Sequence, residues 1–335
     1  MMYRPLLLLI FLVSGTALAE TRQPDTAVVN QFVEEMARQH KFNAKQLQQL
    51  FQQARIQQSI LDAISRPAES KPWYEYRLIF LTADRSRGGV EFWKNNAATL
   101  TRAKQIYGVP EEILIAIIGV ETRYGKNSGN YRVLDALSTL AFAYPPRSQF
   151  FRKELTEYLL MAREEGLAPA GQLGSYAGAM GMPQFIPSSF RRYAVDFDND
   201  GKRNLWTDNA DVIGSVANYF KQHRWQPGEP VVVPVKVHGE RYKQLLDGDL
   251  TPRYTPQQLM DNGVILPKGL SPDLKGSLIK LDGRDGPEYW VGWHNFYVIS
   301  RYNHSALYSM AVYQLSQDIK SRRMKLASES SPGKQ

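Results

Sequence analysis

The chain of 335 residues contains no cysteine. Disulfide bonds, thiolate metal sites and a cysteine nucleophile are therefore excluded, and the free energy of folding must come from a buried core. Long apolar runs are also absent, since no stretch approaches the roughly 20 residues that a membrane-spanning helix needs. The length favours two or three domains over one. We therefore expect a soluble mature chain with a sizeable core.

The first nineteen residues have the pattern of a secretory signal peptide. Arg4 supplies the positive start, residues 6–13 the apolar stretch, and residues 17–19 the small-residue cleavage site. We expect cleavage after Ala19. Residues 13–16 resemble a bacterial lipoprotein cleavage site in which threonine replaces the lipid-bearing cysteine, so no thioether-linked lipid can form. The sequence predicts an exported protein without this anchor.

Basic residues outnumber acidic ones without forming a dense Lys/Arg tract. Once the signal peptide is removed, 40 basic and 33 acidic residues leave a net charge of +7. Such a charge favours nucleic acid, anionic lipid or an anionic wall polymer as a partner. A surface that is merely basic fits the same numbers, so the charge alone does not choose a partner.

The first two thirds of the mature chain have helical periodicity. Apolar residues recur three and four positions apart from residue 25 onward, and Asn43 with Gln46 resembles a capping box. Pro72 then introduces a cluster of aromatic residues, which is typical of a core and also of sugar stacking. Further on, Pro110 at a first helical position opens a helix that is apolar on every side and should be buried.

After residue 226 the pattern changes to short β-branched or aromatic runs. We expect strands at "VVVPVKV", "GVILP", "SLIKL", "EYWVGW" and "FYVIS", followed by a return to helix. The predicted organisation is mainly α, in the α+β class. Its parts are a helical domain at 20–102 joined by a C-terminal helix at 307–323, a core at 103–226, a small β subdomain at 227–300 and a disordered tail at 324–335.

Glu121 is an ionisable residue directly after the apolar run 113–120. Burial and the negative end of the helix dipole both disfavour its charged form, so its pKa should be raised. A carboxylic acid that keeps its proton near neutral pH can protonate a leaving oxygen. The alternative is that Arg123 or another base pairs with Glu121 and makes it structural.

Three stretches resemble the MltB family of lytic murein transglycosylases. They are "ETRYG" at 121–125, the small-residue loop at 174–185, and "RYNHS" at 301–305. The resemblance covers almost the whole mature chain. It implies a lysozyme-like core with an EF-hand-like loop, a flanking helical domain and a small inserted β domain.

The same resemblance implies a reaction and a site. The reaction is cleavage of the β-1,4 bond between N-acetylmuramic acid and N-acetylglucosamine in peptidoglycan, with a 1,6-anhydromuramic product. Glu121 would be both acid and base. The resemblance further implies that Ser175 and Gln184 contact the sugar or its N-acetyl group, that Asn303 lies close to the glutamate, and that three aromatic residues line the cleft: Tyr76, Tyr219 and Tyr308. The family often has two arginines where this chain has Pro146 and Arg147, so a role for the first is lost.

A second catalytic carboxylate is missing from the neighbourhood of Glu121 in the sequence. Hydrolysing glycosidases usually place two carboxylates across the bond. The acid nearest in sequence on the C-terminal side is Asp135, which we expect to orient a helix or a neighbouring base. This lack favours attack by the muramic 6-hydroxyl over attack by water.

Residues 196–211 begin like an EF-hand calcium loop. Asp196, Asp198 and Asp200 occupy positions one, three and five, and the backbone carbonyl of Lys202 occupies position seven. Thr207 stands where the usual bidentate glutamate would be. By the resemblance, Asp211 from the following helix closes the site, with Asp208 as the alternative. A structural Ca²⁺ is expected, and an acidic turn without metal is the other interpretation.

Two other functions stay open at this point. A muramidase would add water across the same bond, and a non-catalytic peptidoglycan-binding protein would use the same cleft. In each case the expected partners are glycan strands and not nucleic acid, with cell-wall synthesis proteins as further candidates. We expect a monomer in the periplasm.

Overall fold

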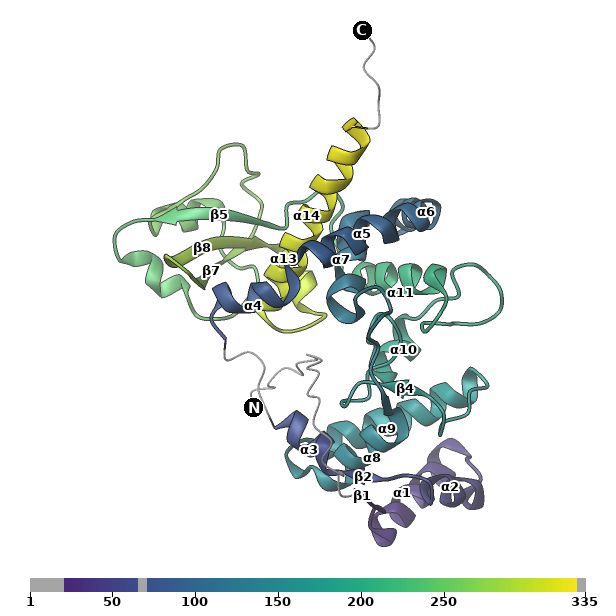
Figure 1. The fold of residues 1–335 in the computed structure, drawn as a ribbon. Helices are drawn as coiled ribbons and strands as arrows, with labels where there is room; N and C mark the ends of the chain where they lie inside the picture. Colours follow the sequence, from purple (N-terminus) through teal and green to yellow (C-terminus); the bar gives the residue numbers. More distant parts are fainter. Residues whose placement is uncertain (1–20, 66–70, 330–335) are drawn as a thin grey trace. The chain divides into compact units, whose positions relative to one another are not determined.

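A computed structural model describes residues 21–65 and 71–329 (Figure 1). The signal peptide predicted at 1–19 lies outside these residues. The described chain is mainly helical, with short antiparallel sheets. This confirms the predicted α+β class.

Two compact units, each closed by its own internal contacts, make up the chain. Unit A contains residues 71–124 and 216–329, and unit B contains residues 21–65 and 125–215. Both units combine segments that are far apart in sequence. This division does not follow the predicted boundaries after residues 102 and 226, so the predicted domain bounds stay a prediction.

In unit A, the long C-terminal helix α14 packs against helix α7, which carries Glu121. Helix α14 contacts α7, α5 and α4, and α4 also contacts strand β7. The helices and strands of unit A are α4 (Trp73–Phe80), α5 (Ala83–Asn95), α6 (Ala97–Tyr107), α7 (Glu111–Thr122), β5 (Val232–Val237), η3 (Arg241–Leu245), α12 (Pro256–Asp261), β6 (Val264–Ile265), β7 (Gly276–Gly283), β8 (Gly286–Trp293), α13 (His294–Ser300) and α14 (Ala306–Glu329).

Helix α7 is buried almost all round, as its sequence predicts. Pro110, predicted at the first helical position, is the N-cap instead, so the helix begins one residue later at Glu111, and Glu111 and Glu112 lie in the first turn. The helix ends where Arg123 adopts the left-handed conformation and donates its backbone N–H to Gly119. Such an end satisfies carbonyl groups that the helix leaves without partners. The last turn of α7 is therefore fixed by the backbone itself.

The β part of unit A is one antiparallel sheet in the order β6-β5-β8-β7. Four of the five predicted strand runs are strands. The run "FYVIS" is wrong, because residues 294–300 form helix α13. A short apolar run cannot be assigned to strand or helix by periodicity alone. One side of the sheet covers a small hydrophobic core: Leu245, Leu259, Val264, Leu278, Val291 and Trp293.

The C-terminal helix is longer than its sequence suggested. We expected helix at 307–323 and disorder at 324–335, but α14 continues to Glu329. Met, Lys, Leu and Ala are good helix formers, and they occupy residues 324–327. Residues 330–335 lie outside the described chain.

Among the described residues, no helix has both the length and the apolar character that crossing a bilayer requires.

Unit B is built around helices α8 and α9. These two helices pack together, and α9 also contacts α10. Asn43 caps α2 by accepting the N–H of Gln46, which confirms half of the predicted capping box. The helices and strands of unit B are β1 (Thr21–Arg22), α1 (Thr26–His40), α2 (Ala44–Phe51), β2 (Ile56–Gln57), α3 (Gln58–Ile64), β3 (Tyr131–Arg132), α8 (Val133–Ala143), η2 (Pro145–Arg147), α9 (Ser148–Glu164), β4 (Leu173–Gly174) and α10 (Pro187–Tyr193). Helix α11 (Asn209–Gln222) begins in unit B and ends in unit A.

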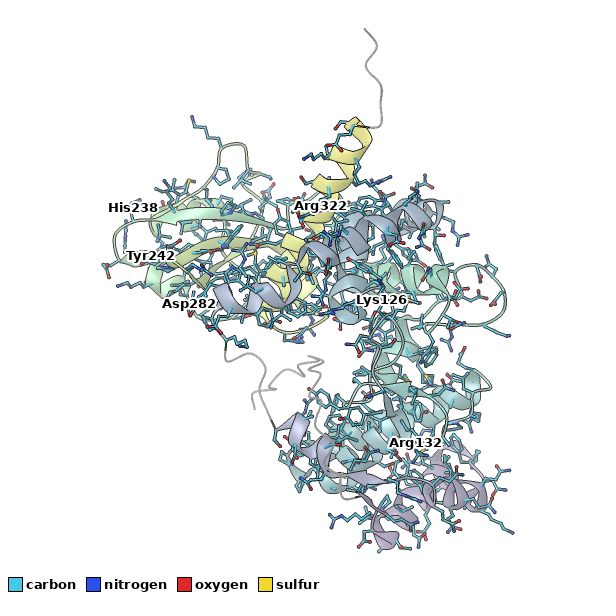
Figure 2. All side chains as sticks on the ribbon, in the orientation of Figure 1. Lys126, Arg132, His238, Tyr242, Asp282 and Arg322 are labelled. Carbon is cyan, nitrogen blue, oxygen red and sulfur yellow. The ribbon has the colours of Figure 1, made fainter. Side chains whose placement is uncertain are left out.

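Asp135 anchors the N-terminal segment of unit B to α8. Its buried carboxylate accepts two hydrogen bonds, each 2.8 Å long, from the side chain of Arg132. Arg132 is labelled in Figure 2. The carboxylate of Asp135 also accepts the backbone N–H of Arg55 at 2.9 Å and the side-chain amide of Gln57 at 3.0 Å. A carboxylate with every lone pair engaged in this way is structural.

Replacing this anchor should destabilise unit B. We expect Asp135→Ala to lower the free energy of unfolding by about 3 kcal/mol, because Arg132 and two other donors lose a buried partner. Urea denaturation followed by circular dichroism measures the change. Asp62→Ala, at an exposed position of α3, is the matched control. Equal losses for the two variants would contradict the anchoring role.

Candidate active site

Glu121 lies in the last turn of α7, next to the start of α14. Its carboxyl oxygen Oε1 accepts a hydrogen bond from the hydroxyl group of Tyr308. Glu121 is partly exposed, whereas Tyr308 is buried. The acid therefore reaches the surface of unit A while its partner is fixed in the core.

Burial raises the pKa of Glu121 to about 8. The hydrogen bond from Tyr308 and the positive charge of Arg85 act in the opposite direction, because both favour the carboxylate. Arg123 is exposed, and within the described chain its side chain forms no ion pair with Glu121. The predicted raised pKa is thus confirmed in direction, and the structural pairing with Arg123 is not found.

Two tyrosines surround the acid as neutral phenols. Burial and the charge of Glu121 raise the pKa of Tyr308 and that of Tyr302 well above their ordinary value. Both phenols therefore keep their protons at neutral pH. Tyr308 is therefore a permanent hydrogen-bond donor to Glu121.

Tyr76 and Tyr219 are both buried in unit A. Tyr76 is fully buried between Trp73 and Phe80, with ring centroids 6.4 Å and 5.3 Å away. Tyr219 is 6% exposed, and its ring centroid lies 4.7 Å from that of Tyr302. Neither ring offers a broad exposed face for stacking.

Asn303 has a buried oxygen without a partner. The residue is 5% exposed, and within the described chain its Oδ1 accepts no hydrogen bond. Buried polar atoms are nearly always satisfied, so such an atom in a native site indicates a missing ligand or water. It lies in the short connection between α13 and α14.

In unit B, two polar side chains of the loop at 174–185 form hydrogen bonds with backbone groups. The Oγ of Ser175 accepts the N–H groups of Ala177 and Ala179 at 3.2 Å and 3.0 Å. The side-chain amide of Gln184 donates to the carbonyls of Ser128 and Gly181, both at 3.0 Å. Its Oε1 is buried and has no partner among the described residues.

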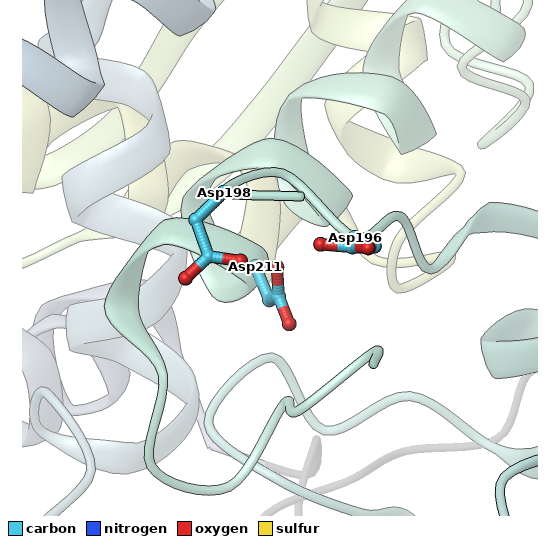
Figure 3. A group of neighbouring side chains, drawn as sticks. All are labelled: Asp196, Asp198 and Asp211. Atoms are coloured by element: carbon cyan, nitrogen blue, oxygen red, sulfur yellow. The ribbon is translucent and has the colours of Figure 1, made fainter. Parts of the chain in front are cut away.

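The predicted metal loop brings three carboxylates together. Asp196 and Asp198 come from the loop and Asp211 comes from α11 (Figure 3). One oxygen atom from each lies within 4.8 Å of the others. Burial, and then the neighbouring acids Asp208 and Asp198, raise the pKa of Asp211. Oxygen ligands of this kind at this spacing fit a hard divalent cation.

The other predicted ligands have different partners. The carboxylate of Asp200 lies outside the group of three and accepts the backbone N–H of Lys202 at 2.9 Å. Asp208 caps α11 by accepting the N–H groups of Ala210 and Asp211. The group of three contains Asp211 and not Asp208, which favours Asp211 as the closing ligand.

Arg85 and Tyr124 are parts of the acid's surroundings that sequence reasoning did not single out. Arg85 is buried in α5, and the hydroxyl group of Tyr124 donates to its backbone carbonyl at 2.8 Å. Tyr124 stands inside the "ETRYG" stretch, so a signal for it was present. Arg85 has no such signal, because it is 36 positions before Glu121 on another helix.

The chain is similar to known enzymes along most of its length. Residues 24–317 match the family described as the transglycosylase SLT domain. Membrane-bound lytic murein transglycosylase B of Escherichia coli K12 is 44% identical over 299 residues, which cover 86% of this chain and 81% of that protein.

Solved structures agree with this likeness. The soluble lytic transglycosylase SltB1 from Pseudomonas aeruginosa is 53% identical, with a TM-score of 0.85, over 88% of this chain and 99% of that one. The E. coli lytic transglycosylase Slt35 in complex with calcium is 44% identical, with a TM-score of 0.81, over 88% and 93%. These matches confirm the predicted fold class with its lysozyme-like core. With this family matched over residues 24–317, the chain belongs to the SLT-domain transglycosylases.

Proposed function

We propose that the protein is a lytic transglycosylase of peptidoglycan. It cleaves the β-1,4 bond between N-acetylmuramic acid and N-acetylglucosamine and leaves a 1,6-anhydromuramic end. The observation that carries this proposal is the carboxyl group of Glu121, which burial keeps protonated at neutral pH. The names of the similar proteins, lytic murein transglycosylases, support the substrate and the reaction.

Glu121 acts first as an acid. It donates its proton to the glycosidic oxygen, and the bond from that oxygen to C1 of the muramic residue breaks with both electrons staying on oxygen. The carboxylate that remains is stabilised by the hydrogen bond from Tyr308 and by the charge of Arg85. The two groups that lower the pKa of Glu121 thus favour the charge that develops during bond cleavage.

Glu121 then acts as a base. Its carboxylate accepts the proton of the muramic 6-hydroxyl group, whose oxygen forms the new bond to C1 and closes the anhydro ring. The enzyme returns to its starting state with Glu121 protonated, and no water is consumed.

The surroundings of Glu121 favour this route over hydrolysis. Among the described residues, Tyr308 and Arg85 are the groups that act on its charge, and no second carboxylate is among them. A hydrolase of the usual kind needs such a carboxylate as nucleophile or base.

Three polar residues are proposed to bind the sugars. The buried oxygens of Asn303 and Gln184 lack partners within the described chain and can accept from an N-acetyl N–H or a hydroxyl group. Ser175 can donate its own proton while its Oγ accepts two backbone N–H groups. Tyr76 and Tyr219 are proposed to shape the site from behind, because their rings are buried.

A calcium ion is proposed in the loop of unit B, held by Asp196, Asp198 and Asp211. A similar structure contains calcium, and the three carboxylates repel one another unless a cation compensates them. Asp200 and the carbonyl of Lys202 are the remaining proposed ligands. The loop touches the segment before Gln184, since the N–H of Met182 donates to the carbonyl of Leu205 at 2.8 Å. The ion is therefore structural.

We infer that the protein works in the periplasm as a monomer on glycan strands. A thioether-linked lipid needs a cysteine, and the sequence has none. Cell-wall synthesis proteins are proposed as further partners.

The products of digestion test the reaction and the acid together. We expect purified peptidoglycan to give anhydro-muropeptides by mass spectrometry, and Glu121→Gln to reduce their release by about 1,000-fold or more, because the variant cannot donate a proton. Glu91→Gln, exposed on α5, is the matched control. Reducing ends would indicate a muramidase, and undiminished release by Glu121→Gln would refute the assignment.

The pH dependence should follow the proton on Glu121. Because the pKa of Glu121 is raised to about 8, the acid form persists up to that pH and is lost above it. We expect kcat/KM to fall above pH 8, about tenfold per pH unit. Tyr308→Phe removes a bond to the carboxylate and should move this fall to higher pH. A fall near pH 5 would show an ordinary, well-solvated carboxyl group.

Calcium removal should destabilise the loop. We expect a chelator to lower the melting temperature by about 5 °C and added Ca²⁺ to restore it. Asp211→Asn should lose this response, whereas Asp62→Asn on α3 should keep it. Identical melting curves with and without chelator would rule the ion out.

A further inference from the structure

Tyr124 fills a slot that three glycines leave open. A Cβ atom added at Gly88 would lie 2.8 Å from the ring of Tyr124, and one at Gly89 would lie 2.7 Å from its hydroxyl oxygen. A Cβ atom at Gly119 would lie 2.5 Å from the same oxygen. These distances are too short for real contacts. The side chain fits between α5 and α7 only because both helices lack side chains there.

The backbone at Tyr124 is held in an unfavourable conformation. Arg123 and Tyr124 have φ angles of 51° and 61°, and neither residue is glycine. Such a conformation costs roughly 1 kcal/mol or more per residue and persists only when the surroundings enforce it. The enforcing contacts come from α5: the ring stacks on Phe92 at 5.7 Å, and the hydroxyl group bonds to the carbonyl of Arg85.

Both the guanidinium group and the backbone carbonyl of Arg85 are held by neighbouring residues. Its guanidinium donates to the carbonyl of Ile79 at 2.8 Å and lies 5.0 Å from the ring centroid of Phe80. Burial lowers the pKa of Arg85 to about 10, so the group is still charged at neutral pH. Its backbone carbonyl receives the hydroxyl group of Tyr124. One residue thus connects the charge that acts on Glu121 to the turn that follows Glu121.

We propose that Tyr124 is a positioning residue for the catalytic acid. Its hydroxyl group holds the backbone of Arg85, and its ring holds the turn after α7, so that the guanidinium and the carboxyl group of Glu121 keep a fixed separation. This inference rests on the proposed function, in which Glu121 is the acid.

Tyr124→Phe is the sharpest variant, because it keeps the ring in its slot and removes only the bond to Arg85. The separation of the two charges then relaxes, and the carboxylate loses part of its stabilisation. We expect the alkaline fall of kcat/KM to move up by roughly half a pH unit, and kcat to decrease more than KM changes. Arg85→Gln removes the charge itself and should move the fall further in the same direction.

The double variant Tyr124→Phe with Arg85→Gln tests whether Tyr124 acts through Arg85. If it does, the double variant should behave like Arg85→Gln alone, because the two substitutions share one pathway. A further shift on top of Arg85→Gln would show that Tyr124 acts independently and would overturn the inference.

A measurement that needs no substrate can test the role of Tyr124 even if the proposed reaction is wrong. The carboxyl group of Glu121 can be titrated by ¹³C NMR in the free protein, with Glu121→Gln identifying its signal. Tyr158→Phe is the matched control, since the buried hydroxyl group of Tyr158 also donates to a backbone carbonyl, that of Pro169, but in unit B. We expect Tyr124→Phe to raise the titration midpoint and Tyr158→Phe to leave it unchanged.

The inference fails if Tyr124→Phe lowers the melting temperature but titrates like the wild type, because Tyr124 is then only structural. It also fails if Tyr158→Phe shifts the midpoint equally. Absence of anhydro products from the wild-type protein would refute the proposed function, whereas the NMR titration would still decide the role of Tyr124. The Tyr124→Phe titration is decisive even when Arg85→Gln does not fold.

Discussion

The hydrogen bond between Tyr308 and Glu121 is the interaction that constrains how the helices of unit A must pack. It joins the end of α7 to the first turns of α14, two segments 187 positions apart. For this bond to form, α7 must be buried along its length and α14 must lie against it, which the contacts of α14 with α7, α5 and α4 provide. The helix packing of unit A therefore brings Tyr308 within hydrogen-bonding distance of the carboxyl group of Glu121.

Two opposing effects set the chemistry of that group. Burial favours the neutral acid, whereas a phenol and a guanidinium favour the anion. With burial alone, Glu121 would hold its proton too firmly to give it away. With the two polar groups alone, it would have no proton to give near neutral pH. A residue that must serve as acid and then as base needs both effects in one place.

Local patterns in the sequence predicted most of this arrangement, and long-range contacts account for what it missed. The apolar run at 113–120 predicts a buried helix, and a carboxylate at its end predicts a raised pKa. In the loop at 196–211, spacing predicted Asp196 and Asp198, whereas Asp211 was implied by the family resemblance. Arg85 was missed because its effect on Glu121 depends on how α5 packs against α7. The run "FYVIS" was assigned to a strand because its four apolar or aromatic residues fit either state, and its helical form depends on packing against α14 and β8.

Unit A is discontinuous, since unit B interrupts it directly after Tyr124. This order has a consequence for biosynthesis. When the ribosome has made α7, Tyr308 does not yet exist, and the carboxyl group of Glu121 has no phenol partner. Nearly two hundred further residues must be translated before the two can meet. The hydrogen bond to Glu121, the proposed catalytic acid, can therefore form only after Tyr308 has been translated, and a chain that ends before Tyr308 lacks this contact.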